Sequence, residues 1–298
     1  MRLTELIEVT EDRLVYSNLA EDDAPLWDDV TTWAAGDTVI YEHAVWEAQA
    51  ENVGKNPAET ENVTWIRLRP TNLFAAFDFK RTTKAQSVAN GEIIYEITPG
   101  LLCDTVALSS VEADTIRIEV FAPNGETMRD ISATLIDTSA VVDWFTYHFE
   151  PVQYAKEYKI SGLPIYRNGR VRVTITGSAE VVKVGRVSVG RSHLIGELLP
   201  DTEVALIDYS DTETDSFGDT TIIKRTSARR VTYRFTMPSE DVERVSALVE
   251  RLNGEPLYAF GEGVSSRLGT SVYGIIQDFS VPQQVGRVIA RLEMKGLT

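Results

Sequence analysis

The sequence is poor in the residues from which many enzymes build metal and nucleophile sites. It contains one cysteine, Cys103, and three histidines, none of which lies at metal-ligand spacing from another histidine or a cysteine. A single cysteine excludes an internal disulfide, and its apolar surroundings favour a buried thiol over a nucleophile. The Gly-x-Ser-x-Gly and glycine-rich lysine motifs are also missing. We therefore expect no catalytic residue, no metal and no cofactor.

Positive charge and long apolar runs are scarce as well. The chain has 29 Lys/Arg against 45 Asp/Glu, and its first seventy residues hold fifteen Asp/Glu against five Lys/Arg. A surface that follows phosphates needs clustered cations, so we expect neither nucleic acid nor an anionic bilayer as a partner. No stretch approaches the ~18 apolar residues of a membrane span, so no direct membrane insertion is expected. The start turns acidic before any apolar run, which speaks against a signal peptide and predicts folding in a cytoplasm.

An acidic run near residue 215 does not fit a calcium-binding loop. Ser216 and Ile222 stand where that loop requires a glycine and a bidentate glutamate. We interpret the run as a solvated or partner-facing loop. Its acidic residues are Asp211, Glu213, Asp215 and Asp219.

Alternation of apolar and polar residues dominates the chain after residue 90. Segments 115–122 and 169–177 each place three β-branched residues on one face, as half-buried antiparallel strands do. Between residues 121 and 128, Asn124-Gly125 predicts a tight hairpin turn. About seven or eight strands between residues 75 and 192, without a helical pattern, predict an antiparallel, jelly-roll-like β-sandwich. The further strands are predicted at 92–98, 104–110, 143–150 and 180–190.

One helix is predicted, at about residues 239–253. Ser239 is the candidate N-cap and Gly254 the stop. Strands are predicted on both sides of this helix, so the last hundred residues are interpreted as an α+β unit. The chain as a whole is thus mainly β, with a small aromatic-rich β module at 1–70, a sandwich at 71–195 and an α+β domain at 196–298. The apolar stripe of the helix consists of Val242, Val245, Leu248, Val249 and Leu252.

Four of the five tryptophans lie between residues 27 and 65. This segment is too short for a conventional core, and packed aromatic rings would supply one. Its spacing also resembles the small chitin-binding type of carbohydrate-binding module. The matching residues are Trp33, Gly36, Asp37, Val39, Tyr41, Trp46, Ala48, Gly54, Pro57 and Trp65.

That resemblance implies a glycan-binding surface, for which the candidate residues are Trp27, Trp33, Tyr41 and Trp46. The sequence departs from the family just after Trp46, where "AQAENVG" has no aromatic residue. Members that bind polysaccharide show exposed rings there, because a flat ring stacks on the apolar face of a sugar. The alternative is that the tryptophans serve only as the core of the module.

Three later segments extend the comparison to almost the whole chain. They are "RPTNLFAAFDF" at 69–79, "VDWFTYHFEP" at 142–151 and "DYSDTETDSFG" at 208–218. Their succession after the module resembles a family of bacteriophage and prophage virion proteins, although Leu73-Phe74 replaces an Arg-Trp pair. The matching residues are Pro70, Thr71, Asn72, Phe77, Asp78, Asp143, Trp144, Tyr147, Phe149, Asp208, Tyr209, Ser210, Glu213, Thr214, Asp215, Phe217 and Gly218.

This second resemblance implies a structural protein of the phage tail, near the tail tip or baseplate. Its expected location is the virion, after synthesis in the host bacterial cytoplasm. The implied partners are other phage tail proteins and copies of the chain itself, in a symmetric ring of three or six.

A basic cluster near residue 227 stands out against the acidic background. It consists of Lys224, Arg225, Arg229 and Arg230. These charges are either the solvent face of a strand or an assembly interface on which the acidic module of a neighbour docks.

Two other functions stay open on the sequence alone. One is a host-surface adhesin that binds glycan through the module at 27–65, with avidity from several copies. The other is a polysaccharide-degrading enzyme, because 45 acidic residues always permit some pair of carboxylates at catalytic separation.

Overall fold

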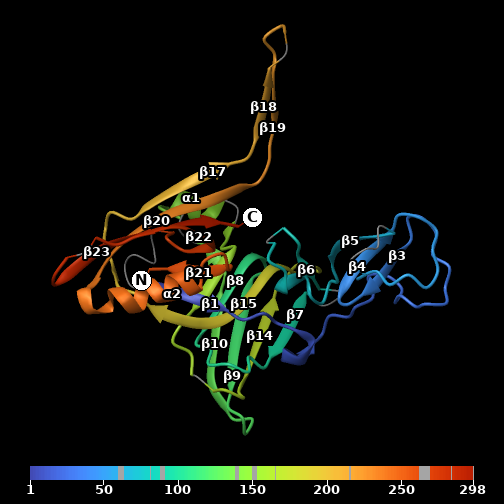
Figure 1. The fold of residues 1–298 in the computed structure, drawn as a ribbon, viewed down its shortest axis with the longest axis horizontal. Helices are drawn as coiled ribbons and strands as arrows, with labels where there is room; N and C mark the ends of the chain where they lie inside the picture. Colours follow the sequence, from blue (N-terminus) through green and yellow to red (C-terminus); the bar gives the residue numbers. More distant parts are fainter. Residues whose placement is uncertain are drawn as a thin grey trace. The chain divides into compact units, whose positions relative to one another are not determined.

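The protein is mainly β, as predicted, and its strands form several antiparallel sheets (Figure 1). The computed structural model describes residues 1–59, 64–80, 82–87, 91–137, 141–149, 153–164, 166–214, 216–261, 269–282 and 284–297. Asp215 of the acidic run lies outside these described residues. The chain divides into two compact units. Unit 1 comprises Met1–Ile7, Cys103–Thr105 and Val189–Thr298, and unit 2 comprises Glu8–Leu102 and Val106–Ser188.

Unit 2 contains the predicted antiparallel β-sandwich. Its five-stranded sheet has the order β10 (Thr127–Thr134), β9 (Thr115–Phe121), β14 (Arg170–Thr176), β7 (Glu92–Ile97) and β2 (Leu14–Ser17). Its other strands follow the order β13 (Glu157–Ile160), β8 (Thr105–Glu112), β15 (Lys183–Leu194) and β6 (Ala85–Gln86), of which β8 and β15 also reach into unit 1. The alternating residues that predicted these strands are buried, among them Ile93, Tyr95, Ile116, Ile118, Val173 and Ile175.

The hairpin between β9 and β10 turns where the sequence places Asn124-Gly125. Gly125 has φ +86°, a left-handed conformation that a glycine adopts without steric cost. The backbone N–H of Ala122 donates to the carbonyl of Glu126 at 2.8 Å, which closes the turn. The hairpin prediction is therefore confirmed.

The strand predicted at 143–150 is wrong. Residues Trp144–Phe149 form a short helix, α1, between the paired strands β11 (Ile136–Asp137) and β12 (Gln153–Tyr154). The sequence Phe145, Tyr147 and Phe149 alternates like a strand. However, the carboxylate of Asp143 accepts the backbone N–H of Thr146 at 2.8 Å, which closes a helical turn instead.

The aromatic-rich module is a three-stranded antiparallel sheet within unit 2. Strand β3 (Thr38–Tyr41) pairs with β4 (Ala44–Ala48), and β4 pairs with β5 (Trp65–Pro70). The β3–β4 turn consists of Glu42 and His43, both with positive φ. A small core lies on one side of this sheet and contains Trp33, Val39, Ala48 and Trp65.

Unit 1 combines one antiparallel sheet with one long helix. Its strands follow the order β15, β1 (Arg2–Leu6), β21 (Leu257–Phe260), β22 (Val272–Ser280), β23 (Arg287–Gly296) and β20 (Ser227–Pro238). β1 pairs with β21, so the first strand of the chain belongs to this unit rather than to a module spanning residues 1–70. Strands β16 (Glu197–Leu198) and β17 (Glu203–Asp208) pair with β20.

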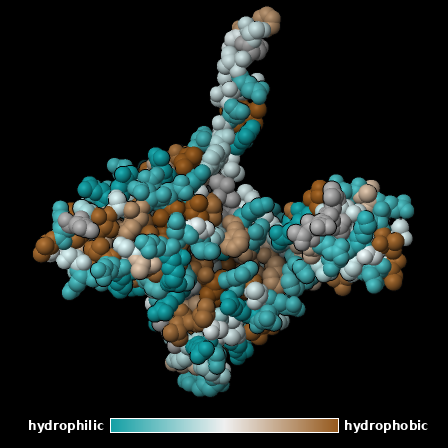
Figure 2. Space-filling model, viewed as in Figure 1, coloured by the Kyte–Doolittle hydropathy of each residue, from teal (hydrophilic) through white to brown (hydrophobic). Residues whose placement is uncertain are grey.

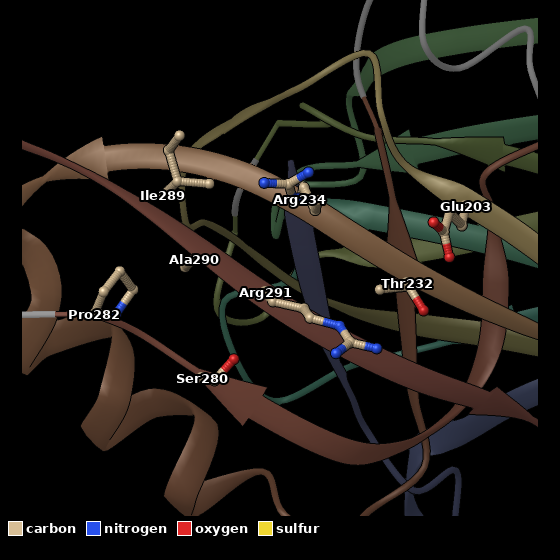
Figure 3. A pocket seen from close by; sticks show the side chains of 8 residues that line it. All are labelled: Glu203, Thr232, Arg234, Ser280, Pro282, Ile289, Ala290 and Arg291. Atoms are coloured by element: carbon tan, nitrogen blue, oxygen red, sulfur yellow. The ribbon is translucent and has the colours of Figure 1, made fainter.

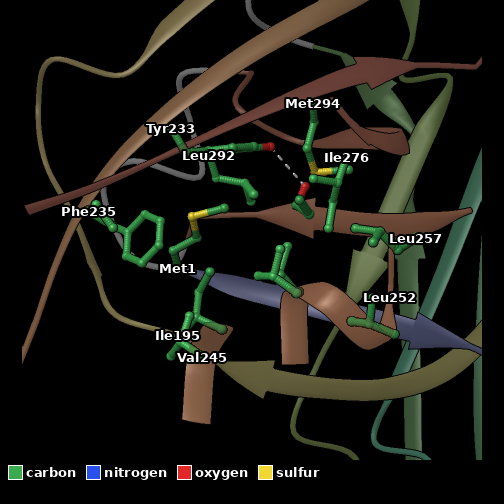
Figure 4. Packing of buried hydrophobic residues seen from close by; sticks show 14 of the residues in the cluster. Met1, Ile195, Tyr233, Phe235, Val245, Leu252, Leu257, Ile276, Leu292 and Met294 are labelled. Carbon is green, nitrogen blue, oxygen red and sulfur yellow. Dashed lines mark hydrogen bonds between the residues drawn. The ribbon is translucent and has the colours of Figure 1, made fainter. Parts of the chain in front are cut away.

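Helix α2 (Val242–Arg251) packs its predicted apolar stripe against this sheet. Val245, Leu248, Val249 and Leu252 are buried in one cluster with residues of β20, β21 and β23 (Figure 4). The prediction that Ser239 caps the helix is wrong. Ser239 instead begins a 3-10 turn, Ser239–Asp241, that precedes α2, and no side-chain cap bond is made there. Gly254, with φ +84°, follows the helix as predicted.

A slender hairpin extends from the β17–β20 pair. It consists of β18 (Asp211–Thr214) and β19 (Thr220–Ile223), which pair only with each other among the described residues. Every residue of both strands is exposed, and Figures 1 and 2 show the hairpin standing free of the sheet from which it extends. We call residues 209–226 the arm. No helix among the described residues is long and apolar enough to cross a membrane.

Candidate functional site

Of the four candidate glycan-binding residues, Trp33 lies in the core of the module, Trp27 and Trp46 pack against that core, and Tyr41 contacts Trp27. Trp33 is only 8% exposed, and Trp27 and Trp46 are partly buried against the cluster that it forms with Trp65. The rings of Trp33 and Trp65 meet edge to face at 6.4 Å between centroids, and those of Trp27 and Tyr41 at 5.4 Å. Such edge contacts stabilise a small core that has few aliphatic residues.

Three of the four indole N–H groups of the module are used within it as well, whereas that of Trp27 is buried without a hydrogen-bond partner among the described residues. The Nε1–H groups donate to backbone carbonyls, from Trp46 to Tyr41 at 3.1 Å and from Trp65 to Lys55 at 3.0 Å. That of Trp33 donates to Asp28 at 3.4 Å. The rings thus fix the loops around the sheet as well as its core, and glycan binding by them stays a prediction.

A polar network holds the β3–β4 turn, and sequence reasoning missed it. His43 Nδ1 lies 3.0 Å from the carboxylate of Glu21, and its ring lies 4.1 Å from that of Phe74, centroid to centroid. The hydroxyl of Thr71 donates to the same carboxylate at 2.5 Å. Glu21 therefore joins the turn of the module to the segment that follows β5. Partners this far apart in sequence leave no periodic signal.

A polar cleft of about 640 Å³ lies in unit 2. Its Asn72 donates its backbone N–H to Asp23 at 2.8 Å and exchanges two side-chain hydrogen bonds with the backbone of Gln86. Arg69 pairs with Asp23 at 2.6 Å, and Lys84 pairs with Glu112. Because these groups bind one another, the polar side chains of the cleft hold segments of unit 2 together. Its lining residues are Asp22, Asp23, Arg69, Asn72, Ala75, Thr82, Thr83, Lys84, Gln86 and Ser87.

A second cleft, of about 440 Å³, lies on the sheet of unit 1 (Figure 3). Its guanidinium groups already have carboxylate partners, Asp201 for Arg234 and Glu293 for Arg291. Among the described residues that line it, Glu203 is the one carboxylate, whereas glycoside cleavage uses two. Its other lining residues are Thr232, Ser280, Pro282, Ile289 and Ala290.

The basic cluster is exposed, but its members do not share one face. Arg229 and Arg230 are neighbours on β20, and successive side chains of a strand point to opposite faces. The guanidinium of Arg229 donates to the carbonyl of Ser271, whereas that of Arg230 lies 3.9 Å from Glu293. Lys224 and Arg225 precede β20, at the base of the arm. The four basic side chains therefore do not form one continuous patch.

Perturbed ionisation does not mark either cleft. Burial lowers the pKa of Lys159 to about 8 and raises the pKa of Tyr95, yet neither residue lines a cleft. Within the described ranges, no group of three His, Cys, Asp or Glu residues is placed to hold a metal ion.

Two exposed apolar elements are the features that the sequence analysis did not identify. In the arm, Phe217 is 91% exposed and Ile222 is 70% exposed. In α1, Trp144 is 76% exposed, and no residue of the helix is buried. Exposed large apolar side chains that gather on one element mark interaction sites more often than isolated ones do.

The comparisons with known proteins add little. No protein-family model matches the sequence, and no curated protein matches it. Among solved structures, the chain is similar to a mutant of chitosan-binding module 1 derived from chitosanase/glucanase from Paenibacillus sp. IK-5. The sequences are 18% identical, the match covers 39% of this chain and 82% of the other, and the TM-score is 0.26.

Proposed function

We propose that this chain is a structural component of a bacteriophage tail and acts by assembling with other tail proteins. The observation that carries the proposal is the arm. An isolated two-stranded hairpin is at best marginally stable in water, because it buries no apolar face. All eight strand residues of the arm are exposed. Contact with another protein would bury the apolar side chains of the arm and stabilise the hairpin.

The anchoring of the arm fits this role. Strand β17 and the first half of β20 pair over six registered residues, from Glu203↔Thr232 to Asp208↔Ser227. That ladder continues into the sheet over the core that α2 covers. A base paired in this way fixes the direction in which the arm leaves the sheet, which suits an element that contacts a neighbouring protein.

The resemblance of three segments to phage virion proteins is the second support, and it is the reason for proposing a phage tail as the assembly. One of these segments, at 208–218, contains half of the arm, and another, at 142–151, contains α1. The segments that carry the resemblance therefore include the two elements that most need a partner.

The test is a particle that carries the protein. We expect mass spectrometry of purified particles to detect the chain, and cryo-electron microscopy to show the arm against a neighbouring tail protein. Replacing Phe217 and Ile222 by serine should lower the yield of complete tails, because it removes apolar side chains that a neighbouring protein would cover. Unit 1 should still fold, since both side chains lie outside its core. The matched control is Ile289→Ser, which removes an exposed apolar residue of the unit 1 sheet instead. Particles that lack the chain would refute the proposal.

A further inference from the structure

Helix α1 presents a dense group of exposed aromatic residues. Single exposed rings are common on protein surfaces, whereas contiguous ones of this size are not. The aromatic side chains of Trp144, Phe145, Tyr147 and Phe149 all have large exposed fractions. Within the described residues, the helix contributes no buried side chain to unit 2.

The helix is nevertheless held in shape by its own residues. The hydroxyl of Thr146 accepts the backbone N–H groups of Val142 and Asp143, both at 3.1 Å, while Asp143 accepts the backbone N–H of Thr146. The rings of Trp144 and Tyr147 stack at 6.0 Å between centroids. A surface that is ordered before it binds loses less conformational entropy on binding. α1 thus has the properties of a binding element.

The charge around α1 is one-sided. Residues 131–155 contain three acidic residues and no Lys or Arg. The opposite holds for residues 220–239, which contain five Lys or Arg and no acidic residue. The exposed parts of these two segments, one in each unit, are opposite in charge, with Asp143 beside α1 and Lys224, Arg225 and Arg229 beside β17. Such complementarity selects the partner and fixes the register of a contact.

The basic segment also borders apolar surface. Val204 and Leu206 lie on β17, opposite Val231 and Arg229 of β20. Residues directly opposite in a ladder share a face, so Leu206 lies beside Arg229. Leu206 is 68% exposed, and β17 pairs on one side only among the described strands. We call Val204, Leu206, Lys224, Arg225 and Arg229 the β17 surface.

We propose that α1 of one copy of the chain docks on the β17 surface of a second copy. The aromatic rings cover Val204 and Leu206, and the guanidinium groups of Arg225 and Arg229 lie over ring faces, where cations are attracted. Trp, Tyr and Arg are also the residues that dominate binding energy in protein interfaces. Because the two surfaces differ, the contact is head to tail and closes into a ring or grows into a filament. This inference adds a self-association contact to the proposed function. It rests on that function for the biological role of the ring or filament.

The test is complementation between two variants, each of which has lost one surface. The first carries Trp144→Ser and Phe149→Ser, and the second carries Leu206→Glu and Lys224→Glu. All four positions are exposed, so the folded units stay intact. We expect the unaltered chain to form oligomers in sedimentation velocity, and each variant alone to sediment as a monomer. An equimolar mixture should form a dimer and nothing larger, because only one competent contact remains.

A matched control variant carries Val15→Ser and Arg67→Glu. Both residues are exposed in unit 2 and belong to neither surface, so this variant should form oligomers like the unaltered chain. Circular dichroism should be the same for all variants, since none removes a core residue.

Three results would overturn the inference. They are a monomeric unaltered chain at every concentration, oligomers of either variant alone, and a mixture that stays monomeric. Binding of the unaltered chain to phosphatidylglycerol vesicles through Trp144, without self-association, would assign α1 to a lipid surface instead. A failure of the proposed function would give a different result. A chain that is absent from purified particles could still form the dimer of the two variants in this assay.

Discussion

The aromatic core of the module and helix α1 use the same residue types for opposite purposes. In the module, Trp33 and Trp65 are buried, and their indole N–H groups donate to backbone carbonyls. In α1, Trp144 and its neighbours face solvent on a helix shaped by Asp143 and Thr146. Both groups are acidic and rich in aromatic residues in the sequence, so composition does not separate them. The difference is whether a sheet lies beside the rings.

The amount of structure around the rings determines whether they are buried or exposed. The three strands β3, β4 and β5, of four, five and six residues, provide a sheet beside which Trp33 and Trp65 are buried. The six residues of α1 are joined to unit 2 through the two-residue pair β11–β12. A helix of this length has too few neighbours in its own chain to cover its rings, which the proposed contact with a second copy would do.

The largest expected difference between the two regions is in stability. Replacing Trp33 by alanine removes a buried ring and leaves a cavity against Trp65, so it should lower the free energy of unfolding of the module by about 3–5 kcal/mol. Urea denaturation followed by the fluorescence of the remaining tryptophans measures this change. The matched control, Trp144→Ala, should shift it by less than about 0.5 kcal/mol. Equal losses in the two variants would refute the comparison.

A smaller effect isolates the polar atom of the indole. Trp46→Phe keeps an aromatic ring but removes the hydrogen bond from Nε1 to the carbonyl of Tyr41, and should cost about 1 kcal/mol. The same exchange at Trp144 should leave the unfolding midpoint unchanged. If Trp46→Phe is also neutral, the indole N–H does not contribute to holding β3 and β4 together.

Solvent access to the indole rings should differ in the same way. Acrylamide quenches the fluorescence of exposed tryptophans, so a quenching titration of the monomeric Leu206→Glu, Lys224→Glu variant, which keeps α1 but has no surface for it to dock on, should show one strongly quenched component. Trp144→Phe should remove that component and leave the weakly quenched emission of the buried rings. Trp27→Phe is the control, and the strongly quenched component should persist in it, since Trp27 is packed against the module core. A quenching curve unchanged by Trp144→Phe would mean that α1 is covered.

Local signals were the part of the fold that the sequence could predict. The stripe from Val242 to Leu252 has helical spacing, and Asn124-Gly125 is a turn pair, so each specifies its structure from a few neighbouring residues. The pairing of β1 with β21 could not be predicted, because strand partners some 250 residues apart are chosen by the packing of the whole sheet.

The candidate sites were harder to predict, for two physical reasons. At 144–149 the aromatic alternation competed with a short polar cap at Asp143 and Thr146, and the cap determined the structure. At 229–230 the alternation rule itself separates the two arginines, because adjacent residues of a strand cannot share a face. Exposure of Leu206 or Phe217 has no sequence signal, since it depends on how the rest of the chain packs around each residue.

The smallest expected effect is an acid-induced loosening of α1 that leaves helix α2 intact. The backbone N–H and hydroxyl of Thr146 hold the pKa of Asp143 below its usual value. The ionised carboxylate therefore stabilises α1 above the ordinary Asp pKa of about 4, and this support is lost as the pH falls through the lower value of the folded state. The amide resonance of Thr146 should move toward its random-coil position on acidification, whereas that of Val245 should not, because α2 is held by apolar packing. In Asp143→Ala the loosening should be present at every pH and the titration should vanish. A Thr146 amide that does not respond to acid would show that α1 is held by contacts other than this cap.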